Sequence, residues 1–242
     1  MLELLLVQEA QARQGRNFLV CYADPIFTQY NMIGLKHRGM AQFLMISLMV
    51  LAAICICVYG VDRPIAIWMQ AHIPHAAKHL FGASLMTRLT QLVYLLLLIG
   101  FVMYYGLRWY GVQHRAMHCF ALVAISVVFA YFAKTNLQYL FGRYVPKYPN
   151  AHQLLFVRKP HLYGFHGWMV GSFPSGHMSV FTAMLVSVML FYPRLRYLVI
   201  GLLSILGVLL VAFNYHFVSD VIAGTYLGAV ISFGLYAMKY GR

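Results

Sequence analysis

His216 and Asp220 stand four residues apart in the segment NYHFVSD, and their types suit nucleophilic chemistry. On a helix, this spacing places two side chains on one face. A carboxylate that accepts the N–H of one imidazole nitrogen fixes the tautomer of the ring and leaves the other nitrogen free to attack. The pair therefore predicts that His216 is a nucleophile and that Asp220 orients it.

A second polar segment, FPSGHMS, has the composition of a helix start that can bind an anion. Pro174 and Ser175 suit the first positions of a helix, and Gly176 lets a ligand approach the backbone closely. Backbone N–H groups at a helix N-terminus bind anions, and His177 would lie in the first turn beside them. The alternative is that Ser175 only caps a helix and His177 only marks a membrane interface.

The elements that must position these residues are membrane helices. The chain has 242 residues, 62% of them hydrophobic and 10% charged, which is typical of a protein whose solvent is lipid. A bilayer core about 30 Å thick requires roughly 20 apolar residues per helix. Six stretches without Lys, Arg, Asp or Glu meet or approach this length: residues 39–61, 89–107, 116–133, 175–193, 197–213 and 221–238. The sequence predicts an all-α polytopic membrane protein with six transmembrane helices in residues 40–242, after a cytoplasmic or interfacial segment, residues 1–39.

The basic residues set the expected orientation of these spans. A net charge of +13 would indicate nucleic-acid binding in a soluble domain, but here the cations punctuate the ends of apolar stretches, as membrane anchors do. Six spans put both termini on one side, together with ten Lys and Arg residues. The positive-inside rule then places the termini in the cytoplasm and the loop 134–174 outside. We expect a bacterial inner (plasma) membrane protein with an extracytoplasmic site and no nucleic-acid partner.

In this topology the third span ends, the fourth begins and the fifth ends at one membrane face. Lys134 and Arg143, at the end of the third span and just after it, can therefore approach both histidines. Such a cluster fits phosphoryl transfer, where positioning and charge stabilisation dominate. Asp220 supports this hypothesis, because the chain has only five acidic residues and one beside an apolar span is costly unless paired. The connection 134–174, rich in Gly, Pro and aromatic residues, is expected to be the catalytic loop.

No metal site is predicted. The four cysteines lack the spacing of metal ligands, and a group of three histidines has no accompanying carboxylate. These residues are Cys21, Cys55, Cys57 and Cys119, and His72, His75 and His79.

The segment PSGH and the pair H-x3-D resemble two motifs of the type 2 phosphatidic acid phosphatase family, whose three motifs are K-x6-R-P, P-S-G-H and S-R-x5-H-x3-D. The resemblance covers roughly residues 116–238 and the layout of six spans. It implies a membrane phosphatase in which His216 becomes a phosphohistidine and His177 protonates the leaving alcohol. It also implies that neither a metal nor another cofactor is needed.

Three cations of the family motifs are absent. The register QYLFGRYVP places Gln138 and Val145 where the first motif has Lys and Arg, and Leu210 stands where the third motif has Arg. The motif histidines and the aspartate are intact, so the departure concerns the phosphate cradle.

Nearby cations offer replacements. Lys134 lies one helical turn before Gln138, and Arg143 lies two residues before Val145. We expect these two cations to bind the phosphate together with the helix start at Ser175 and Gly176. Further candidates are Arg158, Lys159, His161 and His166.

The sequence as a whole predicts a metal-independent enzyme that hydrolyses a phosphomonoester or pyrophosphate of a membrane lipid. A lipid-to-lipid phosphotransferase would use the same chemistry. The altered cations also allow a catalytically inactive lipid-binding relative, although intact His177, His216 and Asp220 argue against it. A transporter with a histidine relay is disfavoured because the span interiors lack charged residues. No motif specifies an oligomeric state or one lipid headgroup.

Overall fold

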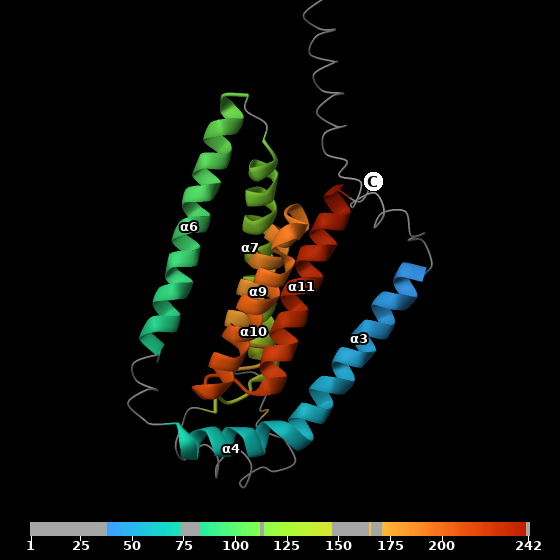
Figure 1. Ribbon diagram of the computed structural model, residues 1–242, viewed down its shortest axis with the longest axis vertical. Coiled ribbons are helices and arrows are strands. Elements are labelled where there is room, and N and C mark those ends of the chain that lie inside the picture. Colours follow the sequence, from blue (N-terminus) through green and yellow to red (C-terminus); the bar gives the residue numbers. More distant parts are fainter. Residues whose placement is uncertain (1–37, 74–82, 112–113, 147–164, 166–170, 241–242) are drawn as a thin grey trace, which may run out of the picture. The chain divides into compact units, whose positions relative to one another are not determined.

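All regular elements in the part of the chain that the structure describes are helices, which confirms the predicted all-α class (Figure 1). A computed structural model describes residues 38–73, 83–111, 114–146, 165 and 171–240. The elements are α3 (Arg38–Ile56), the π-helical turn η1 (Cys57–Val61), α4 (Asp62–His72), α6 (Ala83–Trp109), α7 (Arg115–Phe141), α9 (Gly176–Phe191), the 3-10 turn η3 (Pro193–Leu195), α10 (Arg196–Ala212) and α11 (Val218–Tyr240).

The chain divides into two units, Met1–Leu48 and Met49–Arg242. Of the first unit the structure describes only residues 38–48, which form the first part of α3. Nearly all of the predicted N-terminal segment, residues 1–39, thus lies outside the described residues. All residues of the candidate site belong to the second unit.

Four helical stretches are long and apolar enough to cross a bilayer, which identifies an integral membrane protein. They are Ala41–His72, Arg115–Phe141, Pro193–Ala212 and Val218–Tyr240. The other two predicted stretches also fall in helices, residues 89–107 in α6 and residues 175–193 around α9. With 16 residues, α9 is shorter than the roughly 20 that a span requires. The count of six spans therefore stays a prediction.

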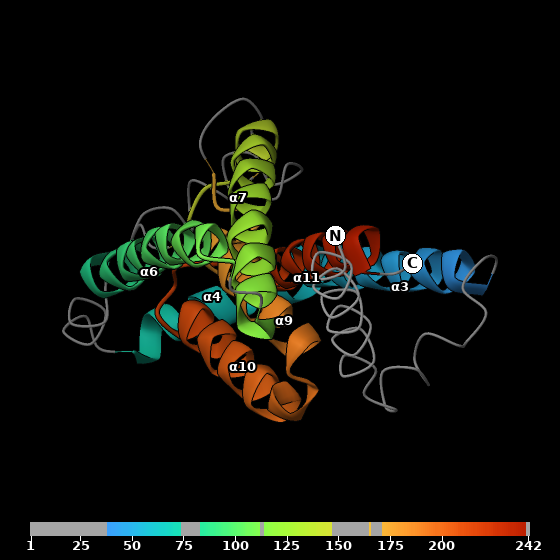
Figure 2. The same ribbon diagram turned by 90° about the horizontal axis from the view of Figure 1, so that it is seen from above.

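Helix α9 is packed among α7, α10 and α11 (Figure 2). Small residues of α11 allow the closest approach: a Cβ atom on Gly228 would lie 2.4 Å from the backbone oxygen of Ser179, and one on Gly224 would lie 2.5 Å from that of Ser175. Such contacts are the usual means by which membrane helices pack. They hold the start of α9 against the start of α11.

A buried serine cluster joins the same helices. The Ser187 hydroxyl lies 3.0 Å from that of Ser126 on α7 and 3.2 Å from that of Ser232 on α11. Ser232 in turn donates to the backbone oxygen of Ala183 over 2.8 Å. Hydrogen bonds of this kind fix the register of apolar helices, which van der Waals contacts alone leave weakly specified.

The segment that follows the first predicted apolar stretch begins as a helix. The π-helical turn η1 precedes α4, whose first residue is Asp62. The Asn214 side chain donates to the Ala66 oxygen of α4 over 3.2 Å, and so joins α4 to the turn between α10 and α11. Asn214 has a φ of 55°, a left-handed conformation that asparagine tolerates better than most residues. This turn also carries His216.

Candidate active site

The two motifs that the sequence singled out are in direct contact. The Ser175 N–H donates to the Asp220 backbone oxygen over 2.9 Å, which joins the start of α9 to the start of α11. The His177 and His216 rings lie edge to face, with their centroids 5.9 Å apart. The ends of α7 and α10 and the starts of α9 and α11 thus meet at one end of the bundle (Figure 1).

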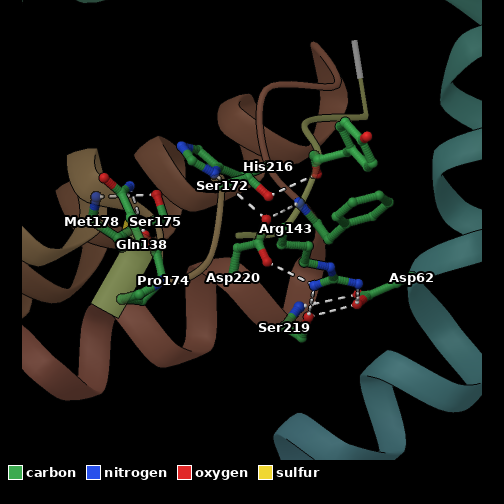
Figure 3. A network of polar contacts seen from close by, with 12 residues as sticks. Asp62, Gln138, Arg143, Ser172, Pro174, Ser175, Met178, His216, Ser219 and Asp220 are labelled. Carbon is green, nitrogen blue, oxygen red and sulfur yellow. Dashed lines mark hydrogen bonds and ion pairs between the residues drawn. The ribbon is translucent and has the colours of Figure 1, made fainter. Parts of the chain in front are cut away.

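Ser175 acts as the N-cap of α9. Its hydroxyl accepts from the Met178 N–H over 3.4 Å, and its carbonyl oxygen accepts from the Ser179 N–H over 3.0 Å (Figure 3). The side chain is fully buried. Ser175 therefore caps the helix start, and its hydroxyl oxygen accepts a hydrogen bond from the helix itself.

A pocket of about 280 Å³ opens at this helix start. Four of the seven predicted site residues line it, namely Lys134, Gly176, His177 and His216. Its other lining residues are Gln138, Val145, Gly171, Ser172, Val180 and Tyr215. The remaining predicted residues, Ser175, Arg143 and Asp220, are buried and do not line this pocket. A pocket of this size suits a phosphoryl headgroup better than a whole lipid.

Lys134 reaches the pocket from α7. Its Nζ donates to the Oε1 of Gln138 over 3.3 Å, and the Gln138 Nε2 donates to the Pro174 oxygen over 3.0 Å. A Cβ atom on Gly176 would lie 3.5 Å from the same Nζ. Gln138 thus holds the ammonium group over the first residue of α9. Among the described lining residues, Lys134 is the one Lys or Arg.

His216 and Asp220 lie close together, although not on one helix face as their spacing predicted. His216 precedes α11, which begins at Val218, and its Nδ1 is 3.6 Å from the Asp220 Oδ2. That distance is slightly too long for a hydrogen bond. The same Oδ2 accepts from the Phe217 N–H over 3.0 Å. Asp220 is therefore held beneath the imidazole with one oxygen directed at its Nδ1.

The position of Arg143 differs from the expected contact with phosphate. Gly142 ends α7 in a left-handed conformation, with a φ of 53°, so that Arg143 leaves the helix axis. Its Nη1 lies 2.7 Å from the Asp220 Oδ1, and its Nη2 lies 2.8 Å from the Asp62 Oδ2 (Figure 3). The side chain is 0% exposed. The Arg143 guanidinium thus binds two carboxylates, whereas the sequence led us to expect that it would bind a phosphate.

Aromatic rings enclose the Arg143 guanidinium. Its Cζ lies 4.1 Å from the Phe217 ring centroid and 4.7 Å from that of Phe165. Arginine stacks on aromatic faces in this way more readily than lysine, because its guanidinium is planar and weakly hydrated. The group is therefore fixed in a closed compartment behind the pocket.

Asp62 is a site residue that the sequence reasoning missed. It is 1% exposed and accepts from the Ser219 N–H over 3.0 Å and from the Ser219 hydroxyl over 2.5 Å. The signal was present: of the five acidic residues, only Asp62 and Asp220 follow residue 37, and both flank apolar stretches. The argument that Asp220 must be paired applies equally to Asp62.

Several predicted candidates lie outside the described residues. They are Arg158, Lys159, His161 and His166 of the predicted catalytic loop, and His75 and His79. Within the part of the chain that the structure describes, no three metal-ligating side chains come together.

The comparison with protein families matched the half of the chain that carries the pocket. The family model of the PAP2 superfamily matches residues 120–242, a range that contains every residue lining the pocket but not Asp62. No curated protein and no solved structure matched the chain. The matched range covers half of the chain and carries both histidines. The protein therefore belongs to the PAP2 superfamily, the type 2 phosphatidic acid phosphatases, whose members are generally phosphatases acting on phosphoesters.

Proposed function

We propose that this protein is a metal-independent membrane phosphatase that hydrolyses a phosphomonoester or pyrophosphate of a lipid through a phosphohistidine at His216. The observation that carries the proposal is that His177 and His216 line one pocket, together with Lys134, which lies over the start of α9. One histidine can attack phosphorus while the other serves the leaving oxygen.

The phosphoryl group would bind between Lys134 and the first turn of α9. Unpaired N–H groups of a first helical turn bind anions, and an ammonium adds a charge-assisted contact. Because Gly176 has no side chain, the phosphoryl oxygens can approach the backbone closely. These donors match the charge that spreads over the equatorial oxygens in the transition state.

The reaction would proceed in two displacements. The Nε2 of His216 attacks phosphorus, the bond to the leaving oxygen breaks, and His177 gives that oxygen a proton. In the second step a water molecule gives a proton to His177 and attacks phosphorus, the bond between nitrogen and phosphorus breaks, and inorganic phosphate leaves. Asp220 faces Nδ1, so it can accept the N–H of that nitrogen after an approach of a few tenths of an ångström from 3.6 Å.

A lipid substrate is supported by an apolar groove that adjoins the pocket. The groove has a volume of about 600 Å³ and is lined by Leu98, Phe101, Ala124, Val127, Val128, Tyr131 and Phe132, from α6 and α7. The Tyr131 ring lies 4.6 Å from the Lys134 Nζ, and Val127 packs against Val180, which lines the pocket. An acyl chain in the groove would place its headgroup beside Lys134.

The topology completes the proposal. Six spans in residues 40–242, with both termini in the cytoplasm, would put the pocket at the extracytoplasmic face of a bacterial inner membrane. The basic residues of the termini and of the loops at residues 108–115 and 194–196 support this orientation.

The test is phosphate release by the purified full-length protein in detergent. A panel of lipid phosphomonoesters and pyrophosphates is assayed with a chelator present, and His216→Ala serves as the blank. We expect release from at least one lipid by the native protein alone. Release from none, or equal release by His216→Ala, would reject the proposed function.

A further inference from the structure

We propose that Asp62 and Arg143 are positioning residues that hold Asp220 toward His216 and set the net charge behind the nucleophile. The inference rests on the proposed function and extends it to a residue outside the range that matches the family. It starts from the network of polar contacts in Figure 3, in which a single guanidinium joins two carboxylates.

The geometry of the guanidinium fixes Asp220. Nη1 binds the Asp220 Oδ1 and Nη2 binds the Asp62 Oδ2, so the planar group cannot rotate without losing one partner. With Oδ1 engaged in this way, the Asp220 Oδ2 remains directed at His216. A lysine at position 143 would carry the same charge but no such fork.

Asp62 acts on Asp220 from a second direction. Its two oxygens accept the backbone N–H and the hydroxyl of Ser219, the residue next to Asp220. The Ser219 N–H belongs to the first turn of α11, where backbone N–H groups have no helical partner. Asp62 therefore anchors the backbone that carries Asp220 as well as the guanidinium that binds its side chain.

The three charges do not cancel. Asp62 and Asp220 contribute −1 each and Arg143 contributes +1, which leaves −1 in a compartment where all three side chains are buried. Interactions between charges are strong where water is excluded. His216, which gains positive charge when it is protonated or phosphorylated, lies directly over this group. Asp62 thus prevents Arg143 from neutralising Asp220.

Other titratable groups also face His216. His177 faces it from α9, Lys134 lines the same pocket from α7, and Tyr215 precedes it in the turn. None of these carries a negative charge at neutral pH. Among the described residues, the negative charge near His216 thus comes from Asp62 and Asp220.

The competing explanation is that the network only stabilises the fold, as buried ion pairs can. The two roles differ in what they predict for the pH dependence of kcat/KM. His216 attacks as a neutral imidazole, so activity falls on the acid side where the ring is protonated. Asp62→Asn changes the net charge of the network from −1 to zero. Protonation of the His216 ring is then less favourable, because the negative charge that stabilises the protonated ring is gone. The acid limb should then move to lower pH by about one unit, the lower end of the effect of a nearby charge.

A second substitution should reverse this shift of the acid limb. Adding Arg143→Met to Asp62→Asn restores a net charge of −1 and should return the acid limb to its original pH, even if the rate stays low. Asp62→Glu keeps the charge and should leave the limb in place. Ser232→Ala, a buried polar change in the same bundle, is the matched control, and it should leave the limb in place whatever it does to stability. An unmoved limb in Asp62→Asn would overturn the proposal.

Arg143→Lys provides a test that does not depend on Asp62→Asn folding. Because it loses the fork but keeps the charge, we expect kcat to fall about tenfold or more, with inhibition by inorganic phosphate unchanged. Weaker inhibition by phosphate would instead indicate that Arg143 binds the phosphate, and would reject the positioning role.

The inference can fail separately from the proposed function. If the native protein hydrolyses no lipid, the proposed function is rejected, and the same variants are compared by the pH dependence of His216 acylation by diethyl pyrocarbonate, read by peptide mass spectrometry. That reagent modifies the neutral imidazole and needs no substrate. The same acid shift in Asp62→Asn, reversed in the double variant, is expected, and equal profiles would reject the inference.

Discussion

The Arg143 guanidinium and the Asp220 carboxylate form a 2.7 Å ion pair across 77 positions of sequence. This contact places a cation beside the carboxylate that faces His216, and Arg143 itself does not line the pocket. The cation that lines the pocket is Lys134, from α7, the helix that ends just before Arg143. The two basic residues that the sequence assigned to one task therefore have different surroundings, and their substitution should have different effects.

His216→Ala should reduce phosphate release to the background rate, because it removes the proposed nucleophile. The native protein, quenched in alkali during turnover of a labelled lipid, should carry an acid-labile phosphate that the variant lacks. Thermal unfolding in detergent serves as the control for folding. Label retained on the protein after this substitution would assign the phosphoenzyme to another residue.

His177→Ala should slow hydrolysis in proportion to the basicity of the leaving group. General-acid help contributes about a hundredfold to ten-thousandfold when the leaving oxygen needs a proton. An alkyl phosphate should therefore lose far more rate than an aryl phosphate with an acidic phenol. Equal losses for the two substrates would contradict the role of proton donor.

Lys134→Met should lower kcat/KM by about a hundredfold, comparable to the loss of one oxyanion donor, and should weaken inhibition by inorganic phosphate. Gln138→Lys in this background should recover part of the activity, because position 138 faces the same pocket one turn further along α7. Asn136→Met is a matched control on α7, at a residue outside the pocket. Near-normal activity of Lys134→Met would show that the cradle is built from other cations.

Ala124→Phe should fill part of the apolar groove and raise KM for lipids with long acyl chains while sparing short-chain analogues. Each buried methylene is worth about 0.8 kcal/mol, so the discrimination should grow with chain length. Ile125→Phe is the matched control, because the neighbouring Ile125 is exposed on α7 and does not line the groove. The same KM change for short and long chains would argue that the groove holds only bulk lipid.

Gly228→Ala should destabilise the bundle by about 1–3 kcal/mol, the usual cost of overpacking. The added Cβ would lie 2.4 Å from the Ser179 oxygen, and backbone atoms cannot move aside as a flexible side chain can. Gly234→Ala, on the same helix with nothing within 4 Å of the added atom, should be nearly neutral. Unfolding temperatures of the two variants in one detergent provide the comparison, and equal values would contradict the close α9–α11 contact.

The sequence predicted the parts of this molecule that depend on local pattern. Long apolar stretches give the all-α class, and the segments PSGH and H-x3-D identify His177, His216 and Asp220, which the structure places at one end of the bundle. The helix start at Ser175 also follows from composition, since serine favours the N-cap position. None of these features requires knowledge of which distant residues meet.

The partners of Arg143 could not be predicted from the local sequence pattern. An arginine just after a helix can bind a phosphate or a carboxylate equally well, and the choice depends on which anion the fold places nearest. Here Asp62 comes from 81 positions earlier in the chain. The left-handed Gly142 turns Arg143 inward, where two carboxylates are already fixed by the N–H groups at the start of α11.

Because Asp62 is the first residue of α4, it limits how far the N-terminal part of this protein can be truncated. A fragment that begins where the family match begins, at residue 120, would keep both histidines and Lys134 yet leave Arg143 with Asp220 as its one acidic neighbour. It would also lose the Ala66 carbonyl that receives the Asn214 amide. A truncated version that is to keep this network must therefore include Asp62, and the cut should lie before the π-helical turn η1.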